Sequence, residues 1–477
     1  MATINPKIFK KYDIRGLASG DSAVVTADSA FQIGRAFGTY VQPFEEIDTV
    51  VVGRDNRNSS YDLQHSLMKG LSQSGIKVID LGLVATPIVY WHAVNKGNVG
   101  GVMVTGSHLG GDQNGFKLCI GHKTLYGQEI QALHAIIEAN EFYYGERDII
   151  ADDSAYSSYI HDLVARIPKS KPLNVVVDAG NGTGGLFAKR LIGLWGHNLV
   201  DCLYCNPDAN YPNHHPNPQV PENMRDLGEK VRETQADIGI AFDGDSDRMG
   251  VVDEQGELIA ADRILALLAQ DMLTRHAGAV VVADVLSSQV LFDAVANAGG
   301  KPIMAASGHS LVKESMREHD ALLGGEMSGH IFLGEDYFGF DDGFLVSGRV
   351  LQLLANSDKT MSQLNAELPT LYSTPEYRPH CPDEDKQTVI DTIADSIFGQ
   401  LDHLIDCPIF GILPDRRRTY EGAGFNRIPD FLRNLDQWRQ IGPDRADRTV
   451  RLNLHFVAAD MIRHSGDVGL SAGTGSG

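Results

Sequence analysis

One secondary-structure pattern occurs three times along this chain. Each copy has an apolar strand, a helix, a glycine and a second apolar strand, in that order. The first strands begin at residues 50, 175 and 280, the helices cover about 61–73, 184–194 and 288–297, and the second strands lie near 76–79, 198–203 and 302–304. This order is typical of parallel strands joined by a crossover helix. The repeat therefore predicts three related α/β domains.

Each copy continues into a further strand that ends in a polar loop. The three loops read Thr105-Gly106-Ser107-His108, Asp243-Gly244-Asp245-Ser246-Asp247-Arg248 and Glu326-Met327-Ser328-Gly329-His330. Ligands of open α/β sheets bind outside the carboxyl ends of the strands. We therefore expect the three loops to face one shared cleft and to form a single composite site.

The acidic loop has the residue types of a metal site. Asp243, Asp245 and Asp247 follow a buried strand, and Gly244 allows a tight turn between them. Hard oxygen ligands on one short loop suit Mg²⁺, which a few carboxylates and phosphate oxygens usually hold. Arg248 would add a fork for a phosphate beside the ion. A solvated acidic turn, or a calcium loop that lacks its other ligands, would explain the same residues.

The first loop has the residue types of a phosphoryl acceptor. The Ser107 hydroxyl lies beside His108, and near Mg²⁺ it could accept a phosphoryl group because the metal neutralises charge on the transferring oxygens. The alternatives are that Thr105 and Ser107 only form turn hydrogen bonds, and that Lys117 is an ordinary surface lysine.

The third loop offers hydrogen-bonding groups to a sugar. A carboxylate can accept from two neighbouring hydroxyls, which suits Glu326 beside Ser328. The loop at Gly308 and His309 could help, although each histidine taken alone is more often structural. Gly180–Gly185 matches no phosphate-binding fingerprint and is interpreted as a tight turn between strand and helix.

Composition excludes several classes of protein. The chain has 477 residues and a net charge of −21, which argues against a nucleic-acid partner because that partner demands a basic face. No 18-residue apolar run or secretory signal is present, so neither a membrane partner nor secretion is expected. Five cysteines are few and fit a reducing cytoplasm, and Cys202-x-x-Cys205 is interpreted as an incidental pair rather than a redox or zinc half-site.

Four motifs together resemble a known family. Their order along the chain is the one seen in α-D-phosphohexomutases. The motifs are residues 9–16 (Phe-Lys-Lys-Tyr-Asp-Ile-Arg-Gly), the Ser107 loop with Asn114-Gly115-Phe116-Lys117, the acidic loop, and the loop from Gly325 to His330. The resemblance covers about residues 5–385 and is nearest to the bacterial phosphomannomutase/phosphoglucomutase members. It implies an isomerase that interconverts hexose 1-phosphate and hexose 6-phosphate, of mannose or glucose, through a phosphoserine and a hexose 1,6-bisphosphate. The implied partners are hexose phosphates alone, and the chain would be a monomer or a dimer.

The resemblance also implies roles for individual residues. Ser107 would be the phosphoserine, and one Mg²⁺ would be held by Asp243, Asp245, Asp247 and the Ser107 phosphoryl oxygen. Glu326 and Ser328 would hold sugar hydroxyls. The residues implied in proton transfer or in positioning the substrate are Tyr12, Arg15, His108, Lys117, Arg248, Gly308, His309 and His330.

The likeness predicts mixed sheets and a fourth, smaller α+β domain. The expected domains are residues 1–150 with the phosphoserine loop, 151–255 with the metal loop, 256–370 with the sugar loop, and 371–460 as a divergent phosphate-binding domain, followed by a flexible tail at 461–477. In the fourth domain Arg445 and Thr449 best match the phosphate loop of the family.

Three departures from the family pattern support a rival hypothesis. The nucleophile loop usually continues Ser-His-Asn-Pro and here reads Ser107-His108-Leu109-Gly110-Gly111, and Leu286 stands where a basic residue is usual. The last domain is also divergent. On the rival hypothesis the chain is a catalytically impaired paralogue that binds sugar phosphate in a regulatory or assembly role.

Overall fold

The computed structural model describes residues 4–371 except 45, 46 and 98, together with residues 385, 388, 389, 391 and 392. Three β-sheets with flanking helices make up its compact unit, which ends at Thr370. None of the helices in this described part of the chain combines the length and the apolar stretch needed to cross a lipid bilayer.

The first sheet has the strand order β1-β5-β4-β2-β3-β7, with β6 paired to β5. Strands β2, β3, β4 and β7 run parallel, whereas β5 is antiparallel to both β4 and β1. The strands are β1 (Ile14–Leu17), β2 (Thr49–Arg54), β3 (Lys77–Leu83), β4 (Gly100–Val104), β5 (Gln113–Ile120), β6 (Lys123–Thr124) and β7 (Ile149–Ala151). The helices along this stretch are η1 (Pro6–Ile8), α1 (Ala27–Val41), α2 (Ser60–Ser72), α3 (Thr86–Asn95), α4 (Gln128–Ala139) and α5 (Ala155–Arg166).

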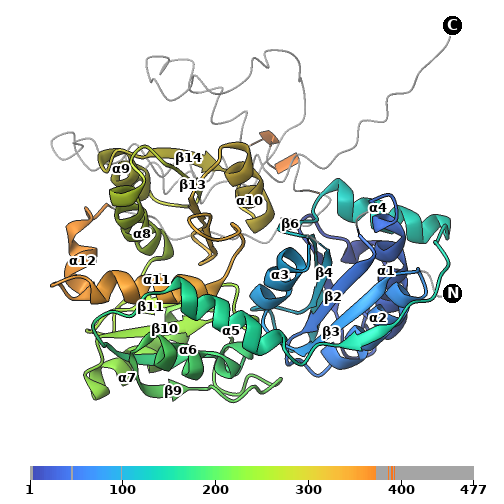
Figure 1. Ribbon diagram of the computed structural model, residues 1–477, viewed down its shortest axis with the longest axis horizontal. Helices are drawn as coiled ribbons and strands as arrows, with labels where there is room; N and C mark the ends of the chain where they lie inside the picture. Colours follow the sequence, from blue (N-terminus) through green and yellow to red (C-terminus); the bar gives the residue numbers. More distant parts are fainter. Residues whose placement is uncertain are drawn as a thin grey trace, which may run out of the picture. The chain divides into compact units, whose positions relative to one another are not determined.

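Alternation along β2 explains how helices cover both faces of this sheet. Helices α1 and α2 lie on one side of this sheet and α3 lies on the other (Figure 1). Val50 and Val52 point into a core with α1, α2 and α4, and Gly53 on the opposite face lies against Val89 of α3. Helices α1 and α2 cross closely because Gly34 and Gly70 leave room, since a Cβ on either glycine would lie 2.2 Å from a carbonyl oxygen of the other helix.

The second sheet has the order β12-β11-β10-β8-β9, and the third has the order β14-β13-β15-β16. The second contains β8 (Asn174–Asp178), β9 (Asn198–Leu203), β10 (Ile238–Phe242), β11 (Met249–Val252) and β12 (Leu258–Ile259), with η2 (Thr183–Leu186), α6 (Ala188–Trp195), η3 (Pro221–Met224) and α7 (Arg225–Thr234). The third contains β13 (Val280–Asp284), β14 (Lys301–Ala305), β15 (Leu323–Gly325) and β16 (Ile331–Leu333), with α8 (Ala261–Arg275), α9 (Gln289–Asn297), α10 (His309–Glu318), α11 (Gly343–Ala355) and α12 (Met361–Glu367).

The predicted repeat is present in all three sheets. The parallel trios β4-β2-β3, β10-β8-β9 and β15-β13-β14 correspond to one another, and an antiparallel strand lies beside each trio at β5, β11 and β16. The prediction of three α/β domains with mixed sheets is therefore confirmed. Nearly all of the predicted fourth domain lies outside the described residues, and so do Arg445, Thr449 and the tail.

Two local predictions had different outcomes. Gly180–Gly182 do form a turn after β8, and Thr183–Gly185 already belong to the short helix η2 that follows it. The interpretation of Cys202 and Cys205 as an incidental pair was wrong, because a disulfide joins them. Tyr204 between them has a φ of +50°, and this turn brings the two Cα atoms to 5.8 Å, within the usual disulfide range.

Candidate functional site

The Ser107 loop of the first domain meets the acidic loop of the second. Ser107 follows β4, is buried, and has a φ of +49°, which residues other than glycine rarely adopt. Its hydroxyl donates to Asp243 Oδ2 at 2.9 Å, and His108 Nδ1 lies 3.1 Å from the same Oγ. Gly244 allows this contact, since a Cβ there would lie 2.4 Å from the Ser107 carbonyl oxygen. The two loops therefore form one site.

The three carboxylates of the acidic loop are buried together. Their side chains each offer an oxygen within 4.8 Å of the others, and their exposure is 0–1%. This burial excludes a solvated acidic turn. Burial and the two neighbouring carboxylates raise the pKa of Asp243 well above its usual value. Asp245 Oδ1 and Asp247 Oδ1 accept no hydrogen bond from any described residue, so these donor atoms fit a hard divalent cation such as Mg²⁺.

Lys117 lies against the acidic loop and is not a surface lysine. It is 4% exposed, and its Nζ donates to Asp245 Oδ2 at 2.7 Å and also to Asp247. Burial alone would lower the pKa of Lys117, but Asp245 and Asp247 outweigh burial and raise it. Thr86, at the start of α3, donates a further hydrogen bond to Asp245 Oδ2 at 2.5 Å. A buried ammonium therefore balances part of the negative charge of the cluster.

Positive charge also surrounds His108. Arg248, burial and Arg15 together hold the pKa of His108 far below its usual value, so its imidazole is neutral. Arg15 lies on β1 opposite Gly115 of β5 and pairs with Asp13 at 2.6 Å. A neutral imidazole therefore lies beside the Ser107 hydroxyl, and two guanidiniums that can donate hydrogen bonds to an anion lie nearby.

The third domain contributes Glu326, which stands just after β15. Glu326 is buried, and its Oε1 accepts from the Gly308 N–H at 2.5 Å. Burial and the nearby Asp284 raise the pKa of Glu326 to about 7. Tyr12 of the first domain donates to the Ser307 carbonyl at 3.0 Å, and Ser328 lies half-buried in the turn that follows Glu326. These contacts bring the predicted sugar-binding residues into one loop cluster.

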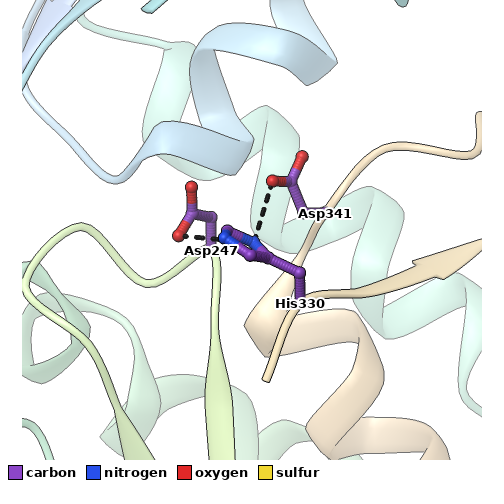
Figure 2. A group of neighbouring side chains, drawn as sticks. All are labelled: Asp247, His330 and Asp341. Atoms are coloured by element: carbon purple, nitrogen blue, oxygen red, sulfur yellow. Dashed lines mark ion pairs between the residues drawn. The ribbon is translucent and has the colours of Figure 1, made fainter. Parts of the chain in front are cut away.

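His330 links the third domain to the acidic loop, as Figure 2 shows. Its Nδ1 lies 3.0 Å from Asp341 Oδ2 and 3.8 Å from Asp247 Oδ1. Arg248 Nε donates to its Nε2 at 2.9 Å, and because arginine can only donate, that ring nitrogen carries no proton. The proton of a neutral His330 therefore lies on Nδ1, facing Asp341.

His309 lies beside this pair at the start of α10. Its ring centre is 5.5 Å from that of His330, and its Nδ1 is 3.7 Å from Asp341 Oδ2. Burial and the ammonium of Lys313 hold the pKa of His309 well below its usual value. His309 is therefore neutral, like His108, and its surroundings disfavour a second proton on the ring.

Sequence reasoning missed several residues that build the site. Asp55 and Arg57 hold the Ser107 loop, while Asp341 and Lys313 form a buried pair at 2.9 Å beside His330. Asp55 follows β2, so the rule that ligands gather at the carboxyl ends of strands could have found it. Asp341 and Lys313 carry no comparable signal, because no motif or strand end marks them. Thr105 does form a predicted turn hydrogen bond, since its Oγ1 accepts from Ser107 N at 2.8 Å.

Comparison with known proteins gives consistent results along the chain. Family models described as phosphoglucomutase/phosphomannomutase alpha/beta/alpha domains I, II and III match residues 6–144, 155–256 and 260–372. A phosphoglucomutase of Neisseria gonorrhoeae is 43% identical over 79% of this chain and 81% of its own length. A phosphomannomutase/phosphoglucomutase of Pseudomonas aeruginosa is 42% identical over 83% and 85% of the two chains.

Solved structures agree with these sequence relatives. The crystal structure of a phosphoglucomutase/phosphomannomutase family protein from Burkholderia thailandensis has a TM-score of 0.75 and 41% identity, and covers 81% of this chain and 84% of that one. A putative phosphomannomutase from Thermus thermophilus, at 23% identity and a TM-score of 0.69, shares the fold. This chain belongs to the phosphoglucomutase/phosphomannomutase family of the α-D-phosphohexomutase enzymes.

Proposed function

We propose that this protein interconverts hexose 1-phosphate and hexose 6-phosphate, with mannose and glucose as its sugars. The single observation that carries the proposal is the contact of the Ser107 hydroxyl with Asp243, at 2.9 Å, inside a buried cluster of three carboxylates. A nucleophile and the donor atoms for a divalent cation thus share one place. The names of the relatives from Neisseria and Pseudomonas support the same activity.

The proposed reaction transfers a phosphoryl group in two steps that mirror each other. Phosphorylated Ser107 gives its phosphoryl group to the free hydroxyl of the sugar phosphate, so a hexose 1,6-bisphosphate forms and the serine hydroxyl is regenerated. The bisphosphate then reorients in the site, so that its other phosphate lies beside Ser107. That second phosphoryl group is transferred to Ser107. The proton lost by the sugar hydroxyl in the first step returns to the product hydroxyl in the second.

Asp243, Asp245 and Asp247 would hold one Mg²⁺ together with an oxygen of the phosphoserine. When bound, that ion neutralises charge on the transferring phosphoryl oxygens. Lys117 keeps the carboxylates in place from the other side, since its Nζ is hydrogen-bonded to two of them. Arg15 and Arg248 are positioned near His108 and would bind phosphate oxygens.

The remaining residues would position the substrate or hold the sugar. His108 and His309 are neutral and would position the substrate through hydrogen bonds, beside His330, whose Nδ1 lies 3.0 Å from Asp341 Oδ2. Glu326 and Ser328 would bind two sugar hydroxyls that glucose and mannose both present. Tyr12 and Gly308 would hold this region in place, through the hydrogen bonds from Tyr12 to the Ser307 carbonyl and from Gly308 N to Glu326. We further propose that these loops face a single central cleft and that the chain works as a monomer or dimer.

A coupled assay tests the proposal directly. Purified protein is given glucose 1-phosphate or mannose 1-phosphate, Mg²⁺ and a trace of hexose 1,6-bisphosphate, and hexose 6-phosphate is measured. We expect turnover of both sugars, with no turnover in chelator. Binding of both sugar phosphates without any turnover would instead support the impaired paralogue, for which the altered residues Leu109, Gly110 and Leu286 are the motive.

A further inference from the structure

Arg57 is a buried arginine that grips the loop carrying Ser107. It is 2% exposed, and its guanidinium donates to three backbone carbonyls of that loop and to a fourth at the first residue of β5. Nη2 donates to the carbonyls of Ser107 at 2.8 Å and Leu109 at 2.6 Å, and Nη1 donates to Gln113 at 2.9 Å and to Gly110. The planar fork of arginine, with five donors, suits such a cluster of acceptors.

Asp55 fixes the guanidinium from the opposite side. Its Oδ2 lies 3.1 Å from Arg57 Nε and also accepts from Thr105 Oγ1 at 2.9 Å and from Gly106 N at 3.0 Å. Gly106 packs directly on the guanidinium, since a Cβ there would lie 2.4 Å from Arg57 Cζ. Arg57 and Asp55 thus hold the loop both before and after Ser107.

The internal hydrogen bonds of the loop are short-range turn contacts, from Ser107 N to Thr105 Oγ1 at 2.8 Å and from Leu109 N to the Gly106 carbonyl at 3.0 Å. Ser107 has a φ of +49°. After His108 the chain continues with Leu109, Gly110 and Gly111, so no proline restrains the backbone there. Glycines leave the backbone more freedom than any other residue. A conformation that is unusual for serine, followed by two glycines, needs an external clamp to stay in one geometry.

We propose that Arg57 is a positioning residue for phosphoryl transfer. Its four hydrogen bonds to backbone carbonyls take the place of a local backbone restraint and keep Ser107 Oγ at 2.9 Å from Asp243. The inference rests on the proposed function, in which Ser107 carries the phosphoryl group. Because a misplacement of 1 Å can cost about 10²-fold in rate, a clamp of this kind acts on kcat more than on substrate binding.

The test compares R57K with a matched control. Lysine keeps a positive charge beside Asp55, but its single nitrogen cannot hold four carbonyls. We expect R57K to lower kcat by about 10²-fold with little change in KM, and to speed hydrogen exchange at the amides of residues 107–113. The control is R35K, because Arg35 is also buried, at 5% exposed, but its guanidinium packs on the rings of Phe142 and Tyr144. It should leave kcat and the exchange of that loop unchanged.

A second variant disturbs the contact between the Arg57 guanidinium and the loop without changing a charge. In G106A the added methyl group occupies the place of the guanidinium, so it should lower kcat and loosen the same amides as R57K does. Rates are normalised to the folded fraction measured by circular dichroism. Wild-type kcat in R57K and G106A, or a lower kcat with unchanged exchange of the loop, would overturn the inference.

The variant S107A separates this inference from the proposed function. Full turnover by S107A would overturn the proposed function, and the inference with it. Loss of turnover in S107A, combined with normal kcat in R57K, overturns the inference alone. Loss of kcat in both, with faster exchange only in R57K, is the result expected.

Discussion

At the scale of single residues, the acidic loop is stable only where positive charge reaches it. Asp243, Asp245 and Asp247 are buried within a few ångströms of one another, and Lys117 supplies one ammonium. At such distances like charges repel by roughly 1–4 kcal/mol for effective dielectric constants of 80 to 20. A divalent cation at Asp245 Oδ1 and Asp247 Oδ1, which accept no hydrogen bond from the part of the chain that the structure describes, would offset this repulsion.

The first prediction follows from this balance. D245N keeps the shape of the side chain but removes a charge, so Mg²⁺ affinity should fall by at least about 10-fold, since even second-shell changes cost 10–100-fold. Isothermal titration calorimetry with Mg²⁺ measures the affinity. D253N is the matched control, because Asp253 is also buried in this domain but accepts from the Gln255 and Glu257 backbone instead. Equal affinities of D245N and the wild type would remove the metal role.

The second prediction concerns pH and Glu326. Because burial raises the pKa of Glu326 to about 7, the folded protein binds a proton there at pH values where the unfolded chain has released it. The free energy of unfolding should therefore fall as the pH rises from about 4.5 to about 7, and E326Q should lose this part of the fall. Urea unfolding at pH 5 and pH 8 measures the difference.

Glu335 provides a control of opposite sign. Burial alone would raise the pKa of Glu335, but the guanidinium of Arg275 outweighs burial and lowers it. The contribution of Glu335 to the free energy of unfolding is therefore already complete above its ordinary pKa of 4.5. E335Q should therefore leave the slope of stability between pH 5 and pH 8 unchanged. An identical slope in wild type and E326Q would show that Glu326 is ionised throughout this range.

At the scale of helices and strands, the third prediction uses two glycines. G70A in α2 should destabilise the protein by about 1–3 kcal/mol, because the new Cβ would lie 2.2 Å from the backbone oxygen of Phe31 in α1. G193A in α6 is the control, since nothing lies within 4 Å of a Cβ there and alanine is favoured over glycine in helices by up to about 1 kcal/mol. Chemical denaturation of both variants measures the sign of the change in the free energy of unfolding. Destabilisation by both variants, or by neither, would show that the close contact of α1 and α2 does not require Gly70.

Much at this scale was readable from the sequence, because strand and helix periods depend on local pattern. The parallel trios followed from apolar runs such as Val175–Val177, and the turn at Gly180–Gly182 followed from its glycines. The burial of Lys117 could not be predicted from the sequence. The local sequence of a lysine on a strand is the same whether its ammonium is hydrated or paired with a carboxylate from another domain. The Cys202–Cys205 disulfide was missed for a related reason, because it depends on the left-handed turn at Tyr204.

At the scale of the molecule, three copies of one fold bring different chemistry to one place. The first domain supplies Ser107, the second supplies Asp243, and the third supplies His330, which lies within 3.8 Å of Asp247. Tertiary contacts created this arrangement, so the sequence predicted the loops but not the roles of Arg57 and Asp341. At this site we expect Ser107 to carry the phosphoryl group between the two positions of the sugar.

Intact-mass analysis with peptide mapping shows whether Ser107 carries the phosphoryl group. Protein is incubated with hexose 1,6-bisphosphate and Mg²⁺, and the phosphorylated peptide is identified in the wild type and in S107A. We predict one phosphoryl group on Ser107 in the wild type, which is lost when hexose phosphate is added, and none in S107A, which should also lack turnover. Phosphate found on another residue, or full turnover by S107A, would contradict the account.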